Sequence, residues 1–329
     1  RMAVEEFSLI ERYFKSSQAS RNISGLDVGI GDDAAILSPP AGQRLCVAVD
    51  TLVSGIHFPE NTTAYDIGYK ALAVNLSDLA AMGASPYAFT LALTLPDTKE
   101  HWLQGFSEGL LTLAKEHQIA LIGGDTTRGP LTISVQVLGL LPHQKALLRS
   151  GAKVGDDIYV SGNIGDAGLG LQIQQGKLIP ATEGKHHHYL LSRLNRPSPR
   201  LALGQALLDL ANSAIDVSDG LLVDLKHILE TSQVGARIKL EAIPLSAAYQ
   251  ACADSQNVPL LHRYTQALEA GDDYELCFSA AKEKRGQLEA LKKHMHITCI
   301  GEIIKEKTLQ CIDANGSELD YAPSGFEHF

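Results

Sequence analysis

Aspartates placed beside strands and at turns are the residues of this chain best suited to chemistry. Carboxylate oxygens without neighbouring His or Cys ligands favour Mg²⁺, Ca²⁺ or Mn²⁺ over Zn²⁺. One Gly-Asp-Asp triplet is weak evidence, and the triplet at 155–157 is expected to be a plain turn. Several acids on otherwise apolar segments are harder to explain as turns, so the sequence indicates a site for hard divalent cations. Its candidate residues are Asp32, Asp33, Asp50, Asp78, Asp125, Asp216 and Asp219.

Asp78 stands in the most apolar stretch of the chain, residues 66–84, which predicts a helix buried inside a domain. An ionised carboxylate in such a helix is costly unless it is hydrogen-bonded, paired or bound to a metal. Asn75 lies three residues earlier on the same helical face, so one polar spot interrupts an apolar cylinder. These residues leave two interpretations open: a carboxylate that caps a neighbouring backbone, or a metal ligand.

Signatures of other sites are weak or missing from the sequence. The DVSDG segment is not an EF-hand, because the twelfth position of that loop is His227 where a Glu is required. No P-loop motif is present. The glycine-rich turn at 162–168 either holds phosphates through backbone N–H groups at a helix start or is a simple tight turn. The histidines form no nucleophilic triad, and residues 186–188 are expected in a solvated loop.

The elements that must position these acids interleave as strands and helices in both halves of the chain. This order predicts two α/β domains. Residues 142–157 are polar and rich in turn residues, so we place the boundary there, between 1–145 and 146–329. The strand from residue 119 is expected to break at Gly123-Gly124. The expected elements cover 5–15, 45–50, 66–84, 88–95, 101–117, 119–129, 131–141, 201–211, 214–230, 237–245, 269–280 and 297–312.

Composition and charge narrow the class of protein. At 329 residues the chain exceeds the usual size of one core, which favours two domains. The formal charge of −10 argues against a nucleic-acid or anionic-membrane surface, since both need clustered Lys and Arg. A phosphorylated ligand remains possible in this acidic chain, because bound Mg²⁺ can invert the local sign of the charge.

The chain is expected to be soluble and cytoplasmic. Its five cysteines are scattered without a CxxC pair, which is typical of reduced thiols. No signal peptide is recognisable near the N-terminus. The longest apolar stretch carries Lys70, Asn75 and Asp78, so a membrane span is not expected.

Ten segments together resemble one known family, in the same order and with matching spacing along nearly the whole chain. They are IGDDAAIL, VDTLVSGIHF, KALAVNLSDLAAMGA, GGDTTRG, LLRSGAK, SGNIGDAGLGL, NRPSPR, DVSDGLLVDL, GDDYEL and GFEHF. Through them the sequence is similar to the thiamine-monophosphate kinases. That family belongs to an ATP-binding superfamily with aminoimidazole ribonucleotide synthetase, selenophosphate synthetase and a hydrogenase maturation protein that dehydrates carbamoyl groups.

The resemblance implies a two-domain fold like that of aminoimidazole ribonucleotide synthetase. An N-terminal α/β domain, 1–145, would bind ATP and Mg²⁺ and carry the dimer contact, and an α+β domain, 146–329, would follow. Strands of two N-terminal domains would form the barrel-like core of a homodimer. The implied reaction converts ATP and thiamine monophosphate to ADP and thiamine diphosphate, with several Mg²⁺ ions. The alternatives are a sibling ATP-dependent synthetase and a catalytically weak metal- or nucleotide-binding scaffold.

The resemblance also implies roles for individual residues, by motif match. Among the implied Mg²⁺ ligands, Asp78, Asp125 and Asp216 are also the implied catalytic residues; the full ligand set is Asp33, Asp50, Asp78, Asp125, Asp216 and Asp219. The implied nucleotide contacts are Gly124, Asp125, Arg149 and Ser218, and the implied thiamine contacts are His57, Asp272 and Phe326. The chain departs from the family pattern at three places: Ala48-Val49 replace Ser-Thr, Asp272 replaces Glu, and Phe326 replaces Tyr or Trp.

The chemistry of the implied reaction agrees with many acids and no histidine base. The nucleophile would be a phosphate oxygen whose second pKa is about 6, so it is already ionised near pH 7. The obstacle is repulsion between a phosphate monoester and a triphosphate. Several Mg²⁺ ions on aspartates would relieve this repulsion and align the two groups for in-line transfer.

Overall fold

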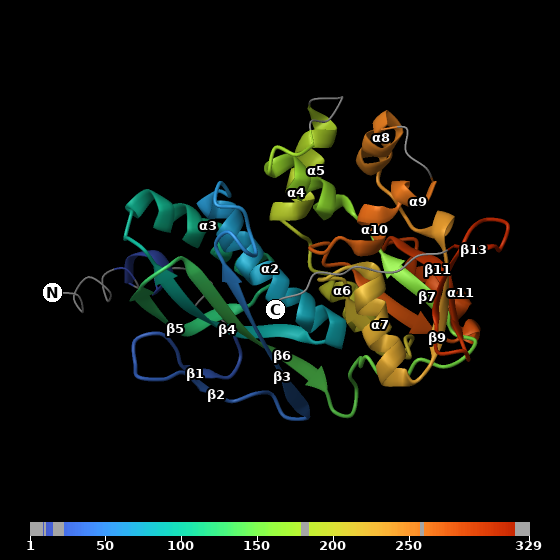
Figure 1. Ribbon diagram of the computed structural model, residues 1–329. Helices are drawn as coiled ribbons and strands as arrows, with labels where there is room; N and C mark the ends of the chain where they lie inside the picture. The colour runs from blue at the N-terminus through green and yellow to red at the C-terminus, as the bar shows by residue number, and fades with distance from the viewer. Residues whose placement is uncertain (1–8, 10, 16–22, 179–183, 257–259, 320–329) are drawn as a thin grey trace. The chain divides into compact units, whose positions relative to one another are not determined.

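The chain divides into two compact units, each with its own sheet (Figure 1). The computed structural model describes residues 9, 11–15, 23–178, 184–256 and 260–319. Unit 1 comprises Arg1–Leu79 and Ala84–Lys145, and unit 2 comprises Ala80–Gly83 and Ala146–Phe329. None of the helices built from the described residues combines the length and apolar character that a membrane crossing needs.

Unit 1 is built on a four-stranded sheet in the order β3-β6-β4-β5. β3 pairs antiparallel with β6, β6 pairs antiparallel with β4, and β4 pairs parallel with β5. A parallel pair needs a crossover, and helix α3 (Glu100–Glu116) provides it. The strands are β3 (Gln43–Val53), β4 (Ser85–Leu95), β5 (Ala120–Arg128) and β6 (Thr132–Pro142). The break expected at Gly123-Gly124 in the strand from residue 119 is wrong, because this strand, β5, continues to Arg128.

Helices α2 (Ala64–Met82) and α3 cover one face of this sheet (Figure 1). The two helices approach closely at Gly68 and Gly109, where a Cβ atom would collide with backbone carbonyl oxygens of the facing helix. Leu72, Leu76 and Leu79 of α2 are completely buried, as an apolar helix requires. The buried helix expected over 66–84 is therefore confirmed.

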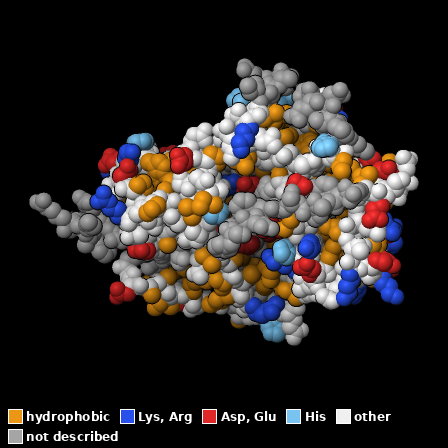
Figure 2. Space-filling model, viewed as in Figure 1, with side chains coloured by type: hydrophobic (Ala, Val, Ile, Leu, Met, Phe, Trp, Pro, Cys, Tyr) orange, Lys and Arg blue, Asp and Glu red, His pale blue; other side chains and the backbone are white. Residues whose placement is uncertain are grey.

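The opposite face of the unit 1 sheet is only partly covered. The small hairpin of β1 (Leu26–Val28) and β2 (Ile36–Leu37) packs over Tyr87 and its neighbours at one end. Along β3, by contrast, the alternating side chains of Leu45, Val47 and Val49 are 44%, 54% and 59% exposed. Figure 2 shows hydrophobic side chains gathered over these strands. An apolar stripe of this kind on a strand is unusual for a surface exposed to water.

Unit 2 contains a seven-stranded sheet in the order β13-β12-β9-β11-β7-β10-β8. Its neighbouring strands are antiparallel except for the β12–β9 pair, so the unit has α+β character. The strands are β7 (Asp157–Ser161), β8 (Ser213–Asp216), β9 (Gly235–Lys239), β10 (Leu276–Ala280), β11 (Ile297–Ile304), β12 (Leu309–Ile312) and β13 (Glu318–Leu319).

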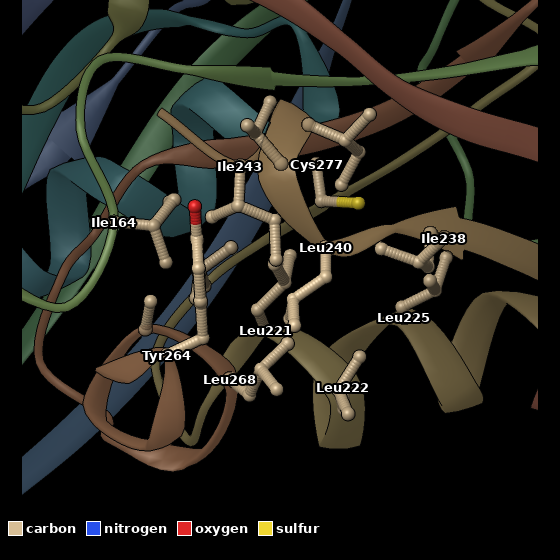
Figure 3. Packing of buried hydrophobic residues seen from close by; sticks show 14 of the residues in the cluster. Ile164, Leu221, Leu222, Leu225, Ile238, Leu240, Ile243, Tyr264, Leu268 and Cys277 are labelled. Carbon is tan, nitrogen blue, oxygen red and sulfur yellow. The ribbon is translucent and has the colours of Figure 1, made fainter. Parts of the chain in front are cut away.

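Helix α7 carries the centre of the unit 2 core. Figure 3 shows its Leu221 near Leu268 and its Leu225 near Ile238, a residue of β9. These apolar contacts fix the rotation of α7 about its axis. The helices of the unit are α4 (Asp166–Gln174), α5 (Lys185–Asn195), α6 (Leu201–Leu207), α7 (Leu221–Ser232), α8 (Ala247–Gln256), α9 (Leu260–Arg263), α10 (Thr265–Glu269) and α11 (Arg285–Leu291).

The expected solvated loop at residues 186–188 is wrong, because the three histidines lie in helix α5. The helix buries Leu190 and Leu194, which are four residues apart and so share one helical face. His186 and His187 are half-buried, and His188 is exposed.

Candidate functional site

A pocket of about 600 Å³ in unit 1 brings together two of the acidic segments of the sequence. Asp32 and Asp33 line it from the Gly-Asp-Asp loop, and Gly124 and Asp125 line it from β5. Both Asp33 and Asp125 are exposed to solvent. The other walls of the pocket are partly apolar and include Phe14. The pocket therefore offers carboxylates on one side and hydrophobic surface on another.

A bulge in β5 determines how Asp125 is presented. Phe89 pairs with Leu121 but Thr90 pairs with Gly123, so one extra residue lies in β5 at this point. Bulges of this kind re-aim the side chains that follow them. Gly124 has a φ of +159°, and a Cβ atom there would collide with the carbonyl oxygen of Leu91. Only glycine allows the two strands to approach this closely immediately before the acid.

Asp50 is positioned from helix α2 by a buried amide. The backbone N–H of Asp50 donates to Oδ1 of Asn75 at 3.0 Å, and Nδ2 of Asn75 donates to the carbonyl of Ala71 at 2.8 Å. Asn75 is completely buried, so both of its amide functions must be satisfied inside the protein. The polar spot on the predicted helix is thus a link to β3.

Asp78 lies on the same face of α2 as Asn75. Burial and, after it, the charge of Asp78 raise the pKa of the Cys46 thiol on β3. Asp78 is half-buried, where the apolar stretch predicts full burial. It lies near Cys46, which belongs to the half-buried row of β3, an edge strand of the sheet.

His57 lies in the turn that follows β3. Its Nδ1 atom accepts a hydrogen bond from the backbone N–H of Val53 at 3.0 Å. An imidazole nitrogen that accepts cannot carry a proton, so the neutral ring is protonated at Nε2. The turn backbone and the ring thereby hold each other in a single orientation.

In unit 2, residues 216–220 connect β8 to α7, and we call them the 216–220 turn. Asp216 and Asp219 both belong to it. Asp216 is the last residue of β8 and is 5% exposed, and Asp219 is half-buried. A single oxygen of Asp224, Oδ2, accepts hydrogen bonds from the backbone N–H groups of Ser218 at 2.9 Å, Asp219 at 2.9 Å and Gly220 at 3.1 Å. The turn is therefore organised by an acid from the first turn of α7.

Three carboxylates are thus concentrated at the 216–220 turn. Burial, together with the charges of Asp216 and Asp219, raises the pKa of Asp224 to about 7 against the opposing effect of the backbone hydrogen bonds. Asp224 is not among the candidate residues that the sequence indicates. The signal that could have found it is an acid four residues after Gly220, inside the first turn of a predicted helix.

Asp272 lies beside the same turn. Its backbone N–H donates to the carbonyl of Ser218 at 2.8 Å, and the N–H of Tyr274 donates to the carbonyl of Val217 at 2.8 Å. Asp272 and Tyr274 both have left-handed backbone conformations, with φ values of +66° and +50°. Such conformations are uncommon outside glycine and are maintained here by the surrounding hydrogen bonds.

The intervening Asp273 is completely buried and settles the role of the glycine-rich turn. Its carboxylate accepts from the N–H of Gly165 at 2.8 Å and of Ala167 at 3.4 Å, at the start of α4. Two of the amides that could have held a phosphate are thus engaged by a side chain of the protein. Of the two interpretations left open by the sequence, the structural turn is the one supported.

Glu275, also completely buried, is the centre of an ion-pair network that the sequence did not reveal. Arg200 donates to it through Nε at 2.7 Å and Nη2 at 2.6 Å, and Arg193 donates through Nη2 at 3.0 Å. Three of the segments that carry the resemblance (SGNIGDAGLGL, NRPSPR and GDDYEL) are joined around these buried acids Asp273 and Glu275. Their shared property is structural support of the segment that holds Asp272.

Two further residues were predicted to contact the substrates, Arg149 and Phe326. Arg149 is exposed, and its carbonyl accepts from Oγ of Ser232 at 3.2 Å. Phe326 lies outside the described residues.

The candidate ligands fit a hard divalent cation in their chemistry. Glu11, Asp32, Asp33 and Asp125 are the acids among the described residues that line the pocket of unit 1, and none of these described residues is a His or Cys. Within the described part of the chain, no three His, Cys, Asp or Glu side chains already converge at a spacing that could hold a metal ion. The donor types therefore suit Mg²⁺, although their side chains are not assembled into a coordination shell.

Two family models together match most of the chain. The model of the AIR synthase related protein N-terminal domain matches residues 31–141, and the model of the C-terminal domain matches residues 153–313. Among curated proteins, the thiamine-monophosphate kinase of Escherichia coli K12 is 48% identical over 330 residues, covering 100% of this chain and 99% of that protein. The thiamine-monophosphate kinase of Bacillus subtilis is 35% identical and covers 99% of this chain and 100% of its own length.

Solved structures give the same result for the fold. The thiamine-monophosphate kinase of Stenotrophomonas maltophilia K279a is 45% identical with a TM-score of 0.84, covering 95% of this chain and 98% of its own. The complex of AaThiL with AMPPCP and TMP is 27% identical with a TM-score of 0.77, covering 100% and 99%. Escherichia coli HypE, a hydrogenase maturation protein, is 19% identical with a TM-score of 0.76 and shares the fold, covering 99% and 98%. The predicted two-domain fold class is thereby confirmed.

Proposed function

The chain belongs to the thiamine-monophosphate kinase family, which makes it an enzyme of the phosphotransferase class, and we propose from this premise that it transfers the γ-phosphoryl group of ATP directly to thiamine monophosphate. The observation that carries the proposal is 48% identity along the entire chain to a kinase of this family. Thiamine diphosphate and ADP would be the products. AaThiL, which shares the fold over the full length, binds AMPPCP and TMP together in its complex.

In unit 1, the proposal assigns Asp33, Asp50, Asp78 and Asp125 as Mg²⁺ ligands. Its support is the common pocket of Asp33 and Asp125 and the position of Asp50 and Asp78 along the contact of β3 with α2. When bound, Mg²⁺ supplies positive charge that neutralises the two phosphate groups and aligns them for in-line displacement. The role of Asn75 is to keep the backbone of Asp50 in place through a buried hydrogen bond.

In unit 2, the proposal assigns Asp216 and Asp219 as further Mg²⁺ ligands. Support comes from their position on one short turn that is fixed by three backbone hydrogen bonds to Asp224. Asp78, Asp125 and Asp216 are the proposed catalytic residues. Nucleotide contacts are proposed for Gly124, Asp125, Arg149 and Ser218, since a glycine backbone, a cation and a hydroxyl are groups that bind phosphates.

The thiamine part of the acceptor is proposed to contact His57, Asp272 and Phe326. The ring of His57 is held by the N–H of Val53 and the backbone of Asp272 is held by Ser218, so both are pre-oriented. Replacement of the family's Glu by Asp272 shortens this side chain by one methylene. Because the acceptor phosphate is ionised at neutral pH, no residue of the chain has to remove a proton.

A homodimer is the proposed assembly, with the β3 stripe of Leu45, Val47 and Val49 in its contact. Three adjacent exposed aliphatic side chains on one strand face support this part of the proposal, because burial would remove them from water. Closure of the two sheets into a barrel-like core is proposed on the same ground. A cytoplasmic location is proposed from the five cysteines, all of which are free thiols.

The departure at Ala48-Val49 affects the proposed metal site less than the sequence suggests. Successive strand residues point to opposite faces. Val49 belongs to the exposed stripe, whereas Ala48 shares the half-buried row of Cys46 and Asp50. Only Ala48 therefore alters the face that carries Asp50. This weakens the alternative that the chain is a scaffold without catalysis.

The test is the formation of ADP by the purified full-length chain. The proposal expects ADP only when both Mg²⁺ and thiamine monophosphate are present, with thiamine diphosphate formed in equal amount. Turnover of Mg-ATP with aminoimidazole precursors but not with thiamine monophosphate would assign the chain to the sibling synthetases instead. Absence of transfer even in a single turnover would leave only the scaffold.

A further inference from the structure

Asp224 is a buried acid for which the proposed reaction has no direct use. We propose that Asp224 is a positioning residue that fixes the backbone of residues 218–220, so that the side chains of Ser218 and Asp219 are presented to the nucleotide and its metal. The part of this proposal that concerns catalysis rests on the proposed function. The part that concerns the turn rests on the structure alone.

The hydrogen bonds of Asp224 exceed what a helix cap requires. A capping side chain usually accepts from one or two backbone N–H groups at the start of a helix. Here one carboxylate oxygen accepts from three consecutive groups, those of Ser218, Asp219 and Gly220. The three amides are therefore held on one oxygen atom of the side chain.

The carboxylate of Asp224 is itself immobile. Asp224 is 2% exposed and lies in the first turn of α7. The flanking Leu221, Leu222 and Leu225 are 0–1% exposed and pack into the core shown in Figure 3. The packing of α7 therefore determines the position of the carboxylate, and the carboxylate determines the position of the turn.

The turn is held from its other side as well. The carbonyl of Ser218 accepts from the N–H of Asp272 at 2.8 Å, while the N–H of Ser218 donates to Asp224 at 2.9 Å. Both backbone polar groups of Ser218 are thus engaged. The N–H of Val217 donates to the carbonyl of Glu275 at 2.7 Å, which ties the start of the turn to the residue that precedes β10. This arrangement leaves the turn backbone little room to move.

The choice of an acid at this position also needs explanation. A negative charge buried beside Asp216 and Asp219 is electrostatically unfavourable. A helix start without a further task could be capped by Ser, Thr or Asn at a much lower cost. An acid is the side chain that accepts most strongly from several amides at once, and this is the property that precise placement of Ser218 and Asp219 requires.

The experiment compares Asp224→Asn and Asp224→Ala with Glu230→Gln as the matched control. Glu230 lies on the same helix, its side chain is 62% exposed and its carboxylate pairs with Lys226, so its substitution keeps the helix and leaves the turn untouched. Asn keeps a side-chain oxygen that can accept, and Ala removes it. The measurements are kcat, the KM for Mg-ATP, the Mg²⁺ midpoint of turnover, the melting temperature, and hydrogen exchange of the amides of residues 218–220.

We expect Asp224→Ala to raise the KM for Mg-ATP or the Mg²⁺ midpoint at least fivefold, Asp224→Asn to fall between it and the wild type, and Glu230→Gln to stay within twofold. Exchange of the three amides should accelerate in the same order. An unchanged KM and Mg²⁺ midpoint in a variant with a lowered melting temperature would overturn the proposal, because Asp224 would then be a helix cap only. If the Ala variant does not fold, the Asn variant decides by the same criteria.

Failure of the proposed function is distinguishable from failure of this proposal. If the wild-type chain transfers no phosphoryl group, kinase function fails, but the amide exchange of residues 218–220 can still be measured with Mg²⁺ and AMPPCP as probes. Faster exchange in Asp224→Asn than in Glu230→Gln would still support fixation of the turn. Equal exchange in the two variants would refute it.

Discussion

Removing the charge of Glu275 should destabilise unit 2 far more than the same change at an exposed acid. Glu275 is completely buried, and it accepts hydrogen bonds from Arg200, Arg193 and, at 2.5 Å, from Oγ of Ser161. Glu275→Gln keeps the size of the side chain but leaves two guanidinium groups without their counter-charge. The amide NH₂ group of Gln is a donor, so it would face the N–H and O–H donors that the carboxylate oxygen accepts from in the wild type.

The size of the effect follows from the exposure of the two arginines. Breaking a buried ion pair by removing one partner costs about 3–5 kcal/mol. The side chain of Arg193 is 10% exposed, whereas that of Arg200 is 34% exposed and can be solvated in part. We therefore expect a loss at the lower end of this range, about 3 kcal/mol. This is a large part of the roughly 5–15 kcal/mol by which a typical domain is stable. The corresponding fall in melting temperature is roughly 6–12 °C.

Glu302→Gln is the matched control for this prediction. Glu302 also pairs with an arginine of unit 2, Arg237, at 3.2 Å, but both side chains are 40% exposed. Exposed pairs contribute about 1 kcal/mol or less, so the control should melt close to the wild type. The assay is thermal and urea unfolding of the full chain, followed by circular dichroism. The reasoning is refuted if Glu275→Gln is no less stable than Glu302→Gln.

Three further predictions address the sites of unit 1 and the acid stability of unit 2. Asp78→Asn should lower turnover more than tenfold, because losing a ligand charge should raise the barrier by more than about 1.4 kcal/mol; near-normal kcat would make Asp78 structural only. Val47→Asp should convert the proposed dimer to monomers in analytical ultracentrifugation, and a dimer of unchanged stability would exclude the β3 stripe from the contact. The hydrogen bond from Arg285 lowers the pKa of Asp157, so this pair adds stability above the ordinary carboxyl pKa of 3.8 and loses it as the pH falls through the lowered value. Arg285→Gln should therefore melt lower near pH 6 and differ less from the wild type near pH 2, whereas an equal difference at both pH values would contradict the assignment.

Regular elements with a strong local signal were predictable from the sequence. The apolar stretch at 66–84 became α2 (Ala64–Met82) because a helix that is hydrophobic all round has to be buried. The strands of unit 1 followed from alternation and β-branched residues. Helix α5 escaped prediction because three histidines and a lysine at its start conceal the apolar face formed by Leu190 and Leu194.

Errors of a second kind came from contacts that are distant in sequence. The expected break of β5 depends on reading Gly124 as a turn, whereas the glycine serves a close approach to Leu91 of β4. The plain turn expected at 155–157 is present, since the N–H of Asp156 donates to the carbonyl of Lys153 at 2.9 Å before β7 begins at Asp157. The burial of Asp157 and its pair with Arg285, 128 residues further along the chain, were not expected. No local pattern announces a partner at that distance.

In the candidate site, the residues suited to chemistry were predictable from the sequence and the residues that support them were not. The acids with proposed metal roles were found because aspartates on apolar segments are conspicuous, and their metal roles stay predictions. The residues that hold them were not found: Asn75 supports Asp50 across 25 residues, and the support of the GDDYEL segment by Arg200 spans 75. A sequence shows which side chains could do chemistry more readily than it shows which side chains keep them in place.

The direct transfer of a phosphoryl group is tested most directly by a single turnover with γ-labelled ATP. Purified chain in excess over ATP is mixed with Mg²⁺ and thiamine monophosphate, quenched at successive times, and the labelled species are separated. The account predicts that label passes from ATP to thiamine diphosphate in one step, with no label released as phosphate and none attached to the protein. Label that appears first as free phosphate or on a protein side chain would contradict it.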